Sequence, residues 1–261
     1  MKTKSIKCNF KNSRGFALDA RLDVPAGIDI KKVTPFIIFC HCFTCTKETI
    51  TSFRLSRLLA EQGYGVLRFD FTGLGDSGGD FSSTTFSTTQ DDLKCAINFL
   101  KDNYQAPLFL MGHSLGGTTA LSVAKEYDFV KGVVTVASPS EPEHVLHHFG
   151  HALTLLEQNI AASFEVAGQH YEIESEFVED VRNTDMQSIL SRLEKPVLIF
   201  SIENDAVVGE DNAKEIQQWI KAETQLIILR NTDHLLSDRQ SSADAAQKII
   251  DWLDSQKIKT L

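Results

Sequence analysis

The chain alternates between short runs of consecutive apolar residues and longer segments in which apolar residues recur every three or four positions. Short continuous apolar runs are typical of strands buried on both faces of a sheet, and the longer spacing is typical of amphipathic helices. The expected buried strands lie at residues 36–40, 65–69, 108–111, 132–136, 197–200 and 226–229. Strands that alternate with helices predict an α/β fold, in which helices cover both faces of a mostly parallel sheet.

Elements of other kinds complete this prediction. Residues 5–10 and 17–24 flank a turn at Ser13-Arg14-Gly15 and predict an antiparallel hairpin at the sheet edge. Helical spacing predicts helices around residues 55–59, 88–100, 115–127 and 245–253, with Thr88 as an expected N-cap.

One long segment interrupts the alternation. Residues 140–195 contain no continuous apolar run, although 162–166 and 171–173 predict a small hairpin and 177–193 predict a helix. A connection this long usually carries function or structure of its own. We therefore expect residues 1–139 and 196–261 to form the core and residues 140–195 to form an inserted lid.

Composition and charge narrow the function. The chain is 42% hydrophobic and 23% charged, which is typical of a globular domain, and its net charge of −9 argues against binding to nucleic acid or to an anionic membrane. No run approaches the roughly 18 apolar residues of a membrane span, and no signal sequence is recognisable. The chain has five cysteines, an odd number, so they cannot all pair, and we expect reduced thiols in a cytoplasmic protein. We expect a monomer or a homodimer.

The strongest motif is Gly112-His113-Ser114-Leu115-Gly116, which follows the predicted strand 108–111 and opens a predicted helix. A tight strand-to-helix turn of this kind exposes a nucleophilic serine, and glycine is needed at both ends because side chains there would collide. The alternatives are a glycine-rich turn with an incidental serine and a phosphate-binding turn. The latter lacks the expected glycine spacing and a following Lys-Ser/Thr.

A serine nucleophile needs a base and an acid that orients the base. Asp205 and His234 each follow a predicted strand, in the chain order that this kind of site requires. His234 is the only histidine after both Ser114 and Asp205. The other candidates for the acid are Glu203, Asp211 and Glu141.

The remaining site residues are expected on loops and on the lid. The backbone N–H groups of Leu115 and Phe43 are expected to form the oxyanion hole. Residues expected to contact substrate are His41, His113, His144, His147 and Phe149. If residues 144–151 are helical, one face carries three histidines: His144, either His147 or His148, and His151. The alternatives for this face are a metal site and a solvated helix surface. Cys40, Cys42 and Cys45 lack the second cysteine pair of a common zinc site, so we expect no metal. The serine mechanism needs no cofactor, and we expect none.

Together these residues resemble the α/β-hydrolase superfamily, in the branch of serine aminopeptidase-like and monoacylglycerol lipase-like esterases. Residues 68–77 are similar to the Asp-x-Arg-Gly-x-Gly-x-Ser loop of that branch, with Phe71-Thr72 in place of the usual pair. A closer resemblance is to the hydrolase part of bacterial proteins fused to an OsmC-like peroxidase, carried by residues 41–47, 69–79, 112–117 and 233–237. Cys42 stands where the wider superfamily usually has glycine. Because the sequence ends at Leu261, we expect either a stand-alone homologue or a separated piece of such a fusion, without peroxidase chemistry of its own.

These observations predict a serine hydrolase that cleaves a small ester or acyl substrate through an acyl-enzyme. A peptidase or amidase of the same fold is the alternative, with the lid carboxylates as candidates to hold a free amine: Glu172, Glu174, Glu176, Glu179 and Asp180. A non-catalytic partner module for an OsmC-like peroxidase is the third hypothesis.

Overall fold

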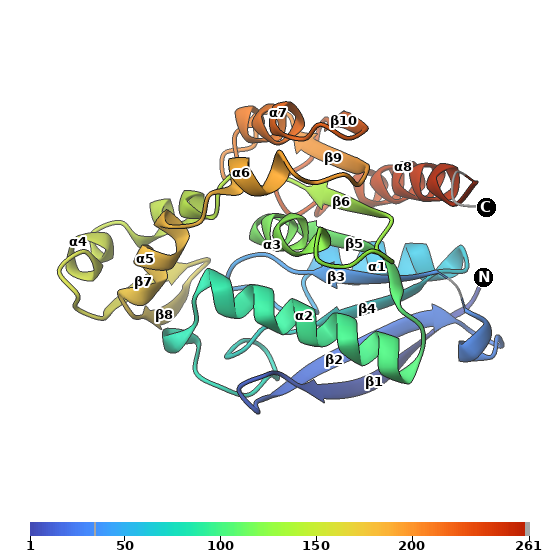
Figure 1. The fold of residues 1–261 in the computed structure, drawn as a ribbon, viewed down its shortest axis with the longest axis horizontal. Helices are drawn as coiled ribbons and strands as arrows, with labels where there is room; N and C mark the ends of the chain where they lie inside the picture. Colours follow the sequence, from blue (N-terminus) through green and yellow to red (C-terminus); the bar gives the residue numbers. More distant parts are fainter. Residues whose placement is uncertain (34, 259–261) are drawn as a thin grey trace.

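The computed structural model describes residues 1–33 and 35–258, which contain an eight-stranded sheet in the order β1-β2-β4-β3-β5-β6-β9-β10 (Figure 1). The strands are β1 (Thr3–Lys11), β2 (Ala17–Pro25), β3 (Phe36–Cys40), β4 (Gly65–Phe69), β5 (Pro107–His113), β6 (Gly132–Val136), β9 (Val197–Ile202) and β10 (Thr224–Leu229). All pairs from β4 to β10 are parallel, whereas β2 is antiparallel to both β1 and β4. The predicted strands and the edge hairpin are confirmed.

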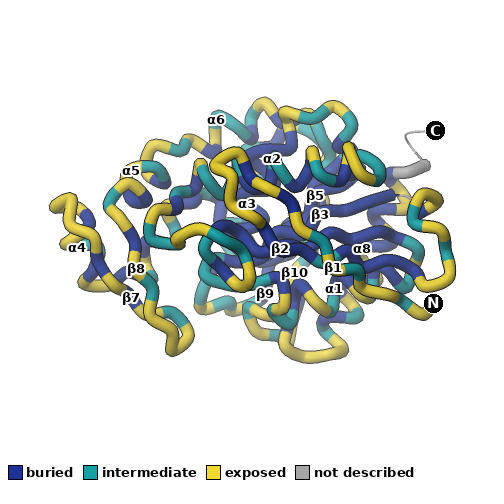
Figure 2. The backbone as a smooth tube through the Cα atoms, turned by 90° about the horizontal axis from the view of Figure 1, so that it is seen from below, coloured by how far each residue is buried: buried dark blue, intermediate teal, exposed yellow. Residues whose placement is uncertain are grey.

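Helices cover both faces of this sheet. The helices α2 (Phe86–Asn103), α3 (Leu115–Ala124) and α7 (Glu210–Trp219) pack on one face, and α1 (Ile50–Glu61) and α8 (Arg239–Ile258) pack on the other (Figures 1 and 2). Because side chains alternate along a strand, β3 contributes Phe36, Ile38 and Cys40 to the first core and Ile37 and Phe39 to the second. Among the described residues, no helix combines the length and the apolar character needed to cross a membrane.

The register brings the carboxyl ends of the parallel strands to one edge. Cys40 of β3 pairs with Gly112 of β5, and Leu229 of β10 pairs with Ile202 of β9. The loops after β3, β5, β9 and β10 therefore converge, which is where open α/β sheets bind ligands.

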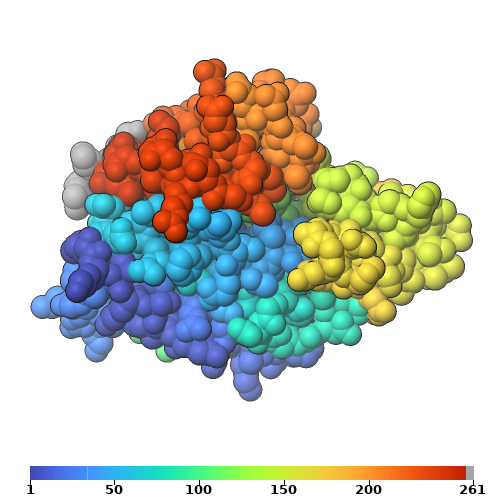
Figure 3. Space-filling model, turned by 180° about the vertical axis from the view of Figure 1, so that it is seen from behind, coloured from blue at the N-terminus to red at the C-terminus, as the bar shows by residue number. Residues whose placement is uncertain are grey.

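The segment between β6 and β9 forms a lobe at one end of the molecule (Figures 1 and 3). It contains a 3₁₀ helix (Pro142–Phe149), α4 (Ala152–Leu156), the hairpin of β7 (Ala162–Val166) and β8 (Gln169–Ile173), α5 (Glu176–Arg182) and α6 (Met186–Leu190). The lobe has its own apolar core, which includes Phe149, Phe164 and Phe177. The predicted hairpin is confirmed.

Two helix predictions are wrong in detail. The helix expected over 177–193 is broken into α5 and α6, because the Asp185 side chain accepts the N–H of Ser188 and caps a new helix. The N-cap of α2 is Thr85 rather than Thr88. Thr85 and Thr88 form a reciprocal capping box, so the expected cap lies inside the first turn.

Candidate active site

Ser114 lies at the turn between β5 and α3, in a backbone conformation with φ +52° and ψ −131°. A positive φ is rare for a residue with a side chain, so the surrounding structure must hold it in place. The N–H of Ser114 donates to the carbonyl of Val136 at 2.8 Å, and its own carbonyl accepts the N–H of Gly117 at 2.8 Å. This is the turn that the sequence motif predicts.

The glycines of the turn have a steric function, as expected. A Cβ atom on Gly112 would overlap the backbone of Gly116, and one on Gly116 would overlap the carbonyl groups of Cys40 and His41. The start of α3 therefore lies directly against the loop that follows β3. Leu115 is the first residue of α3, so its N–H has no partner within the helix.

Asp205 and His234 meet across the ends of β9 and β10. The Nδ1 atom of His234 lies 2.8 Å from Oδ2 of Asp205, whose side chain is almost fully buried. Burial opposes the charge of Asp205, but hydrogen bonds from His234 and from the N–H groups of Val207 and Val208 hold its pKa below the ordinary value. A charged carboxylate in this position fixes the tautomer and the orientation of the imidazole.

The other candidates for the acid have different partners. Glu203 forms an ion pair with Arg230, and Asp211 forms one with Lys214. Glu141 accepts the backbone N–H of Met186 at 3.3 Å.

Two further histidines hydrogen-bond to the loops that carry Asp205 and His234. One is His113, next to the serine, and the other is His144, in the lobe. Nε2 of His113 lies 2.7 Å from the carbonyl oxygen of His234, and Nε2 of His144 lies 2.8 Å from that of Val207. Burial, followed by the charge of His234, lowers the pKa of His113 to about 3, so this imidazole is neutral and donates through Nε2.

A cavity of about 580 Å³ opens over the serine and contains both Ser114 and His234. Its lining includes the loop after β3, the lobe hairpin and the loop after β10: Cys42 to Thr46, His148, Val166, Ala167, Gln169, Tyr171, Val207, Asp233 and Leu235. A volume of this size is ordinary for a small-molecule site.

None of the five residues expected to contact substrate is part of this lining. His41 is buried beneath the loop, and Phe149 is buried in the lobe core, where its ring packs on Phe43 and Phe164. The ring of His144 is hydrogen-bonded to the carbonyl oxygen of Val207. His147 is exposed, and its ring is hydrogen-bonded to the carbonyl oxygen of His144.

His148 is the residue that sequence reasoning did not select. It lines the cavity, and its ring stacks on Phe43 with centroids 6.3 Å apart. Burial, together with His147, His144 and His234, lowers its pKa to about 4, so it is a neutral polar group in the cavity wall. The cluster of histidines was the only signal for it.

The loop after β3 is fixed from both ends. Nδ1 of His41 donates to the carbonyl of Cys42 at 2.8 Å, and Nε2 accepts the N–H of Phe71 at 3.2 Å. At the other end, the backbone N–H of Lys47 donates to Oδ1 of Asp70 at 2.6 Å. Phe43, between these anchors, contacts both the cavity of Ser114 and the aromatic core of the lobe.

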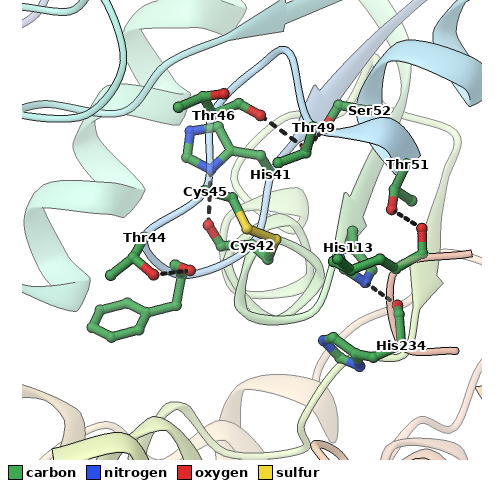
Figure 4. Close-up of a disulfide and its surroundings, with 12 residues drawn as sticks. His41, Cys42, Thr44, Cys45, Thr46, Thr49, Thr51, Ser52, His113 and His234 are labelled. Carbon is green, nitrogen blue, oxygen red and sulfur yellow. Dashed lines mark hydrogen bonds between the residues drawn. A yellow bond between two sulfur atoms is a disulfide. The ribbon is translucent and has the colours of Figure 1, made fainter. Parts of the chain in front are cut away.

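The cysteine prediction is corrected by this loop. Cys42 and Cys45 form a disulfide across the turn, while Cys8, Cys40 and Cys95 are free (Figure 4). Five cysteines exclude complete pairing, but they do not exclude one local pair.

One group of carboxylates resembles a metal site. Among the described residues, Asp19, Asp70 and Asp76 are the set close enough to share an ion. The Nζ atom of Lys47 already lies 2.9, 2.6 and 3.0 Å from their oxygens. The lysine ammonium therefore supplies the positive charge, and its removal would leave the buried carboxylate of Asp70 uncompensated.

Comparison with known proteins identifies the family and the fold of the chain. The sequence profile of the family described as serine aminopeptidase, S33, matches residues 32–184, which is more than half of the chain. The chain belongs to this family. An esterase domain of a Rhodothermus marinus protein is 31% identical, with a TM-score of 0.74 over 97% of this chain and 98% of that one. The family and this likeness establish the α/β-hydrolase fold for the chain.

Curated relatives of this S33 family member include a lipase and a thioesterase. A thermostable monoacylglycerol lipase of Bacillus sp. is 25% identical over 76% of this chain and 82% of its own. A mouse mitochondrial palmitoyl-protein thioesterase, ABHD10, is 29% identical over 45% of this chain. The chain matches only 38% of the length of that thioesterase.

Proposed function

We propose that this chain is a serine hydrolase that cleaves small carboxylic esters through an acyl-enzyme intermediate. In this mechanism Ser114 attacks the carbonyl carbon, His234 accepts and later returns the proton, and Asp205 stabilises the imidazolium. The observation that carries the proposal is that Ser114, on a strained turn, shares one cavity with an imidazole held by a buried carboxylate.

The oxyanion would be bound by the N–H groups of Leu115 and Phe43. Leu115 is the first residue of α3, and Phe43 lies on the loop against which the start of α3 packs. Phe43 and Leu115 also line one small cavity of about 30 Å³ beneath this contact, which supports their proximity.

We infer that residues 140–195 act as a lid. The tip of the β7–β8 hairpin and His148 supply one wall of the cavity, while Val207 and Leu235 supply the other. These walls are mainly apolar and favour an acyl chain over a highly charged group. The relatives that are named as a lipase and a thioesterase act on substrates with an acyl group, which agrees with this choice.

The peptidase alternative needs an acidic group that faces the substrate. The five lid carboxylates named above are not part of the cavity lining, whereas Asp233 is. Hydrogen bonds to Ser237 and neighbouring N–H groups outweigh the burial of Asp233 and lower its pKa, so it remains charged. Asp233 is therefore the group that an amine substrate would use.

The deciding experiment combines a fluorophosphonate probe with two substrate panels, p-nitrophenyl esters of increasing chain length and amino-acid anilides. We expect the probe to label Ser114, and we expect kcat for esters to fall by about three powers of ten or more in Ser114→Ala, with the fold retained. Undiminished ester hydrolysis by Ser114→Ala would overturn the proposal. Turnover of anilides in preference to esters would favour the peptidase. No labelling and no turnover would favour a non-catalytic module, such as a peroxidase partner.

A further inference from the structure

The Cys42–Cys45 disulfide lies in the wall of the cavity that is lined by Ser114 and His234. Figure 4 shows it on the loop between His41 and the pair formed by His113 and His234. Cys45 is partly exposed, whereas Cys42 is only 6% exposed. A small thiol that enters the cavity therefore meets Cys45, which lines the cavity, as the more accessible half of the disulfide.

The disulfide closes a turn whose backbone is strained. The N–H of Cys45 donates to the carbonyl of Cys42 at 3.1 Å, and Thr44 between them has φ +57°. Threonine is β-branched, so this left-handed conformation is strained. The covalent link holds the ends of the turn together, so Thr44 cannot relax by opening it.

The same turn orients the proposed oxyanion donor. The carbonyl of Cys42 accepts hydrogen bonds from the N–H of Cys45 and from His41, so it points into the turn. In a planar trans peptide the following N–H, that of Phe43, points the opposite way. If the turn opens, one of these two bonds is lost and the peptide that carries the Phe43 N–H is free to rotate.

Other contacts keep the effect local. Lys47 remains bound to Asp70, His41 remains bound to Phe71, and the hydroxyl of Tyr171 lies 3.1 Å from the carbonyl of Thr44. None of these contacts involves the sulfur atoms. Loss of the disulfide should therefore change the turn and leave the fold intact.

We propose that Cys42 and Cys45 form a redox-active site for dithiol reductants, and that reduction lowers hydrolysis by releasing the oxyanion turn. This inference rests on the proposed function. Strained or exposed disulfides are usually the labile, regulatory or catalytic ones, which agrees with a switch at this position.

The exchange is a two-electron reduction. A thiolate of the dithiol attacks the sulfur of Cys45, which forms a mixed disulfide and releases the Cys42 thiolate. The second thiolate of the dithiol then attacks the first sulfur of the dithiol, which is bonded to Cys45 in the mixed disulfide, and releases the Cys45 thiolate. The dithiol ends as a cyclic disulfide, and its two protons pass through solvent to the two protein thiolates. A low-molecular-weight disulfide reverses the reaction.

The test uses the full chain with Cys8→Ser and Cys95→Ser, so that maleimide labelling of the native protein reports the pair in the loop. Cys40 is fully buried in β3 and will not react in the folded state. The protein is reduced with dithiothreitol and the reagent is removed. The labelled mass, the thermal midpoint and the kinetics with a p-nitrophenyl ester are then measured. Ser114→Ala, treated identically, supplies the blank for direct reaction of the thiols with the ester.

We expect reduction to expose both thiols of the pair and to lower kcat by about tenfold or more, with KM changed much less, because the loss concerns a transition-state contact. Reoxidation with glutathione disulfide should restore kcat. Cys45→Ser should have the low kcat of the reduced protein and should not respond to dithiothreitol.

Two results would overturn this inference alone: an unchanged kcat after both thiols are labelled, or an equal response of Cys45→Ser to the reductant. Absence of Ser114-dependent turnover in the oxidised protein would overturn the proposed function as well. If Cys45→Ser does not fold, the reversible cycle of the parent protein still decides the matter.

Discussion

The side chain of His113 donates a hydrogen bond to the backbone carbonyl of His234, at 2.7 Å from Nε2 to oxygen. The two residues are 121 positions apart, and their rings lie 4.7 Å apart between centroids. His113 is adjacent to the proposed nucleophile, so a single contact ties the loop of the base to the turn of the serine. We interpret His113 as a positioning residue rather than as a substrate contact.

His113→Phe should therefore reduce both stability and activity. The substitution keeps a ring of similar shape but leaves the buried carbonyl of His234 without a donor, which costs about 1–3 kcal/mol in the free energy of unfolding. We expect kcat to fall more than KM rises. Urea unfolding and steady-state kinetics measure the two effects, and His170→Phe, at an exposed position on β8, is the control. Wild-type kcat in His113→Phe would contradict the positioning role.

Asp205→Asn tests the proposed acid. The amide cannot stabilise the imidazolium and favours the wrong tautomer of His234, so kcat should fall by about a thousandfold or more while the fold is retained. Asp211→Asn is the matched control, because Asp211 is exposed and pairs only with Lys214 on the surface of α7. Equal losses in both variants, or none in Asp205→Asn, would show that the acid lies elsewhere.

His148 should make stability depend on pH. In the folded protein burial lowers its pKa to about 4, whereas in the unfolded chain it takes up a proton below about 6.5. The unfolded state therefore binds more protons between these values, and the free energy of unfolding should fall as the pH is lowered from about 6.5 to about 4. His113, with its pKa lowered to about 3, acts in the same direction.

The measurement is urea unfolding across this pH range for the wild type and for His148→Gln. Glutamine remains polar but does not titrate, so the variant should lose less stability than the wild type on acidification. Parallel curves for the two proteins would show that His148 does not contribute to the slope.

The hydrophobic pattern predicted most of the sheet because a strand buried on both faces must be apolar along its whole length, as β3, β4 and β6 are. It also predicted which loops carry the site. The carboxyl ends of parallel strands meet at one edge, so Ser114, Asp205 and His234 could be grouped from their positions after strands.

The lobe was predicted less well because local hydrogen bonding decides its structure. Residues 142–149 form a 3₁₀ helix, with about three residues per turn, so His144 and His147 share a side. His148 is the one that lines the cavity, although its ring lies 3.8 Å from that of His147. An α-helical spacing could not separate them. The disulfide was missed for a related reason: whether two cysteines three residues apart can pair depends on the turn between them, and the turn follows from anchors at His41 and Lys47.

The close packing around Gly116 offers a final test. A methyl group on Gly116 would overlap the carbonyl oxygens of both Cys40 and His41, which are backbone atoms that cannot rotate away. Gly116→Ala should therefore push α3 from the loop after β3, lower the free energy of unfolding by about 1–3 kcal/mol or more, and separate the Leu115 and Phe43 N–H groups. Gly209→Ala is the matched control, since its φ is −60° and no heavy atom lies within 4 Å of the added carbon. Urea unfolding measures the stability, and the rate of fluorophosphonate labelling at Ser114 reports the oxyanion donors. If Gly116→Ala were as stable and as reactive as Gly209→Ala, α3 could not be packed against this loop, and Phe43 could not be the second donor.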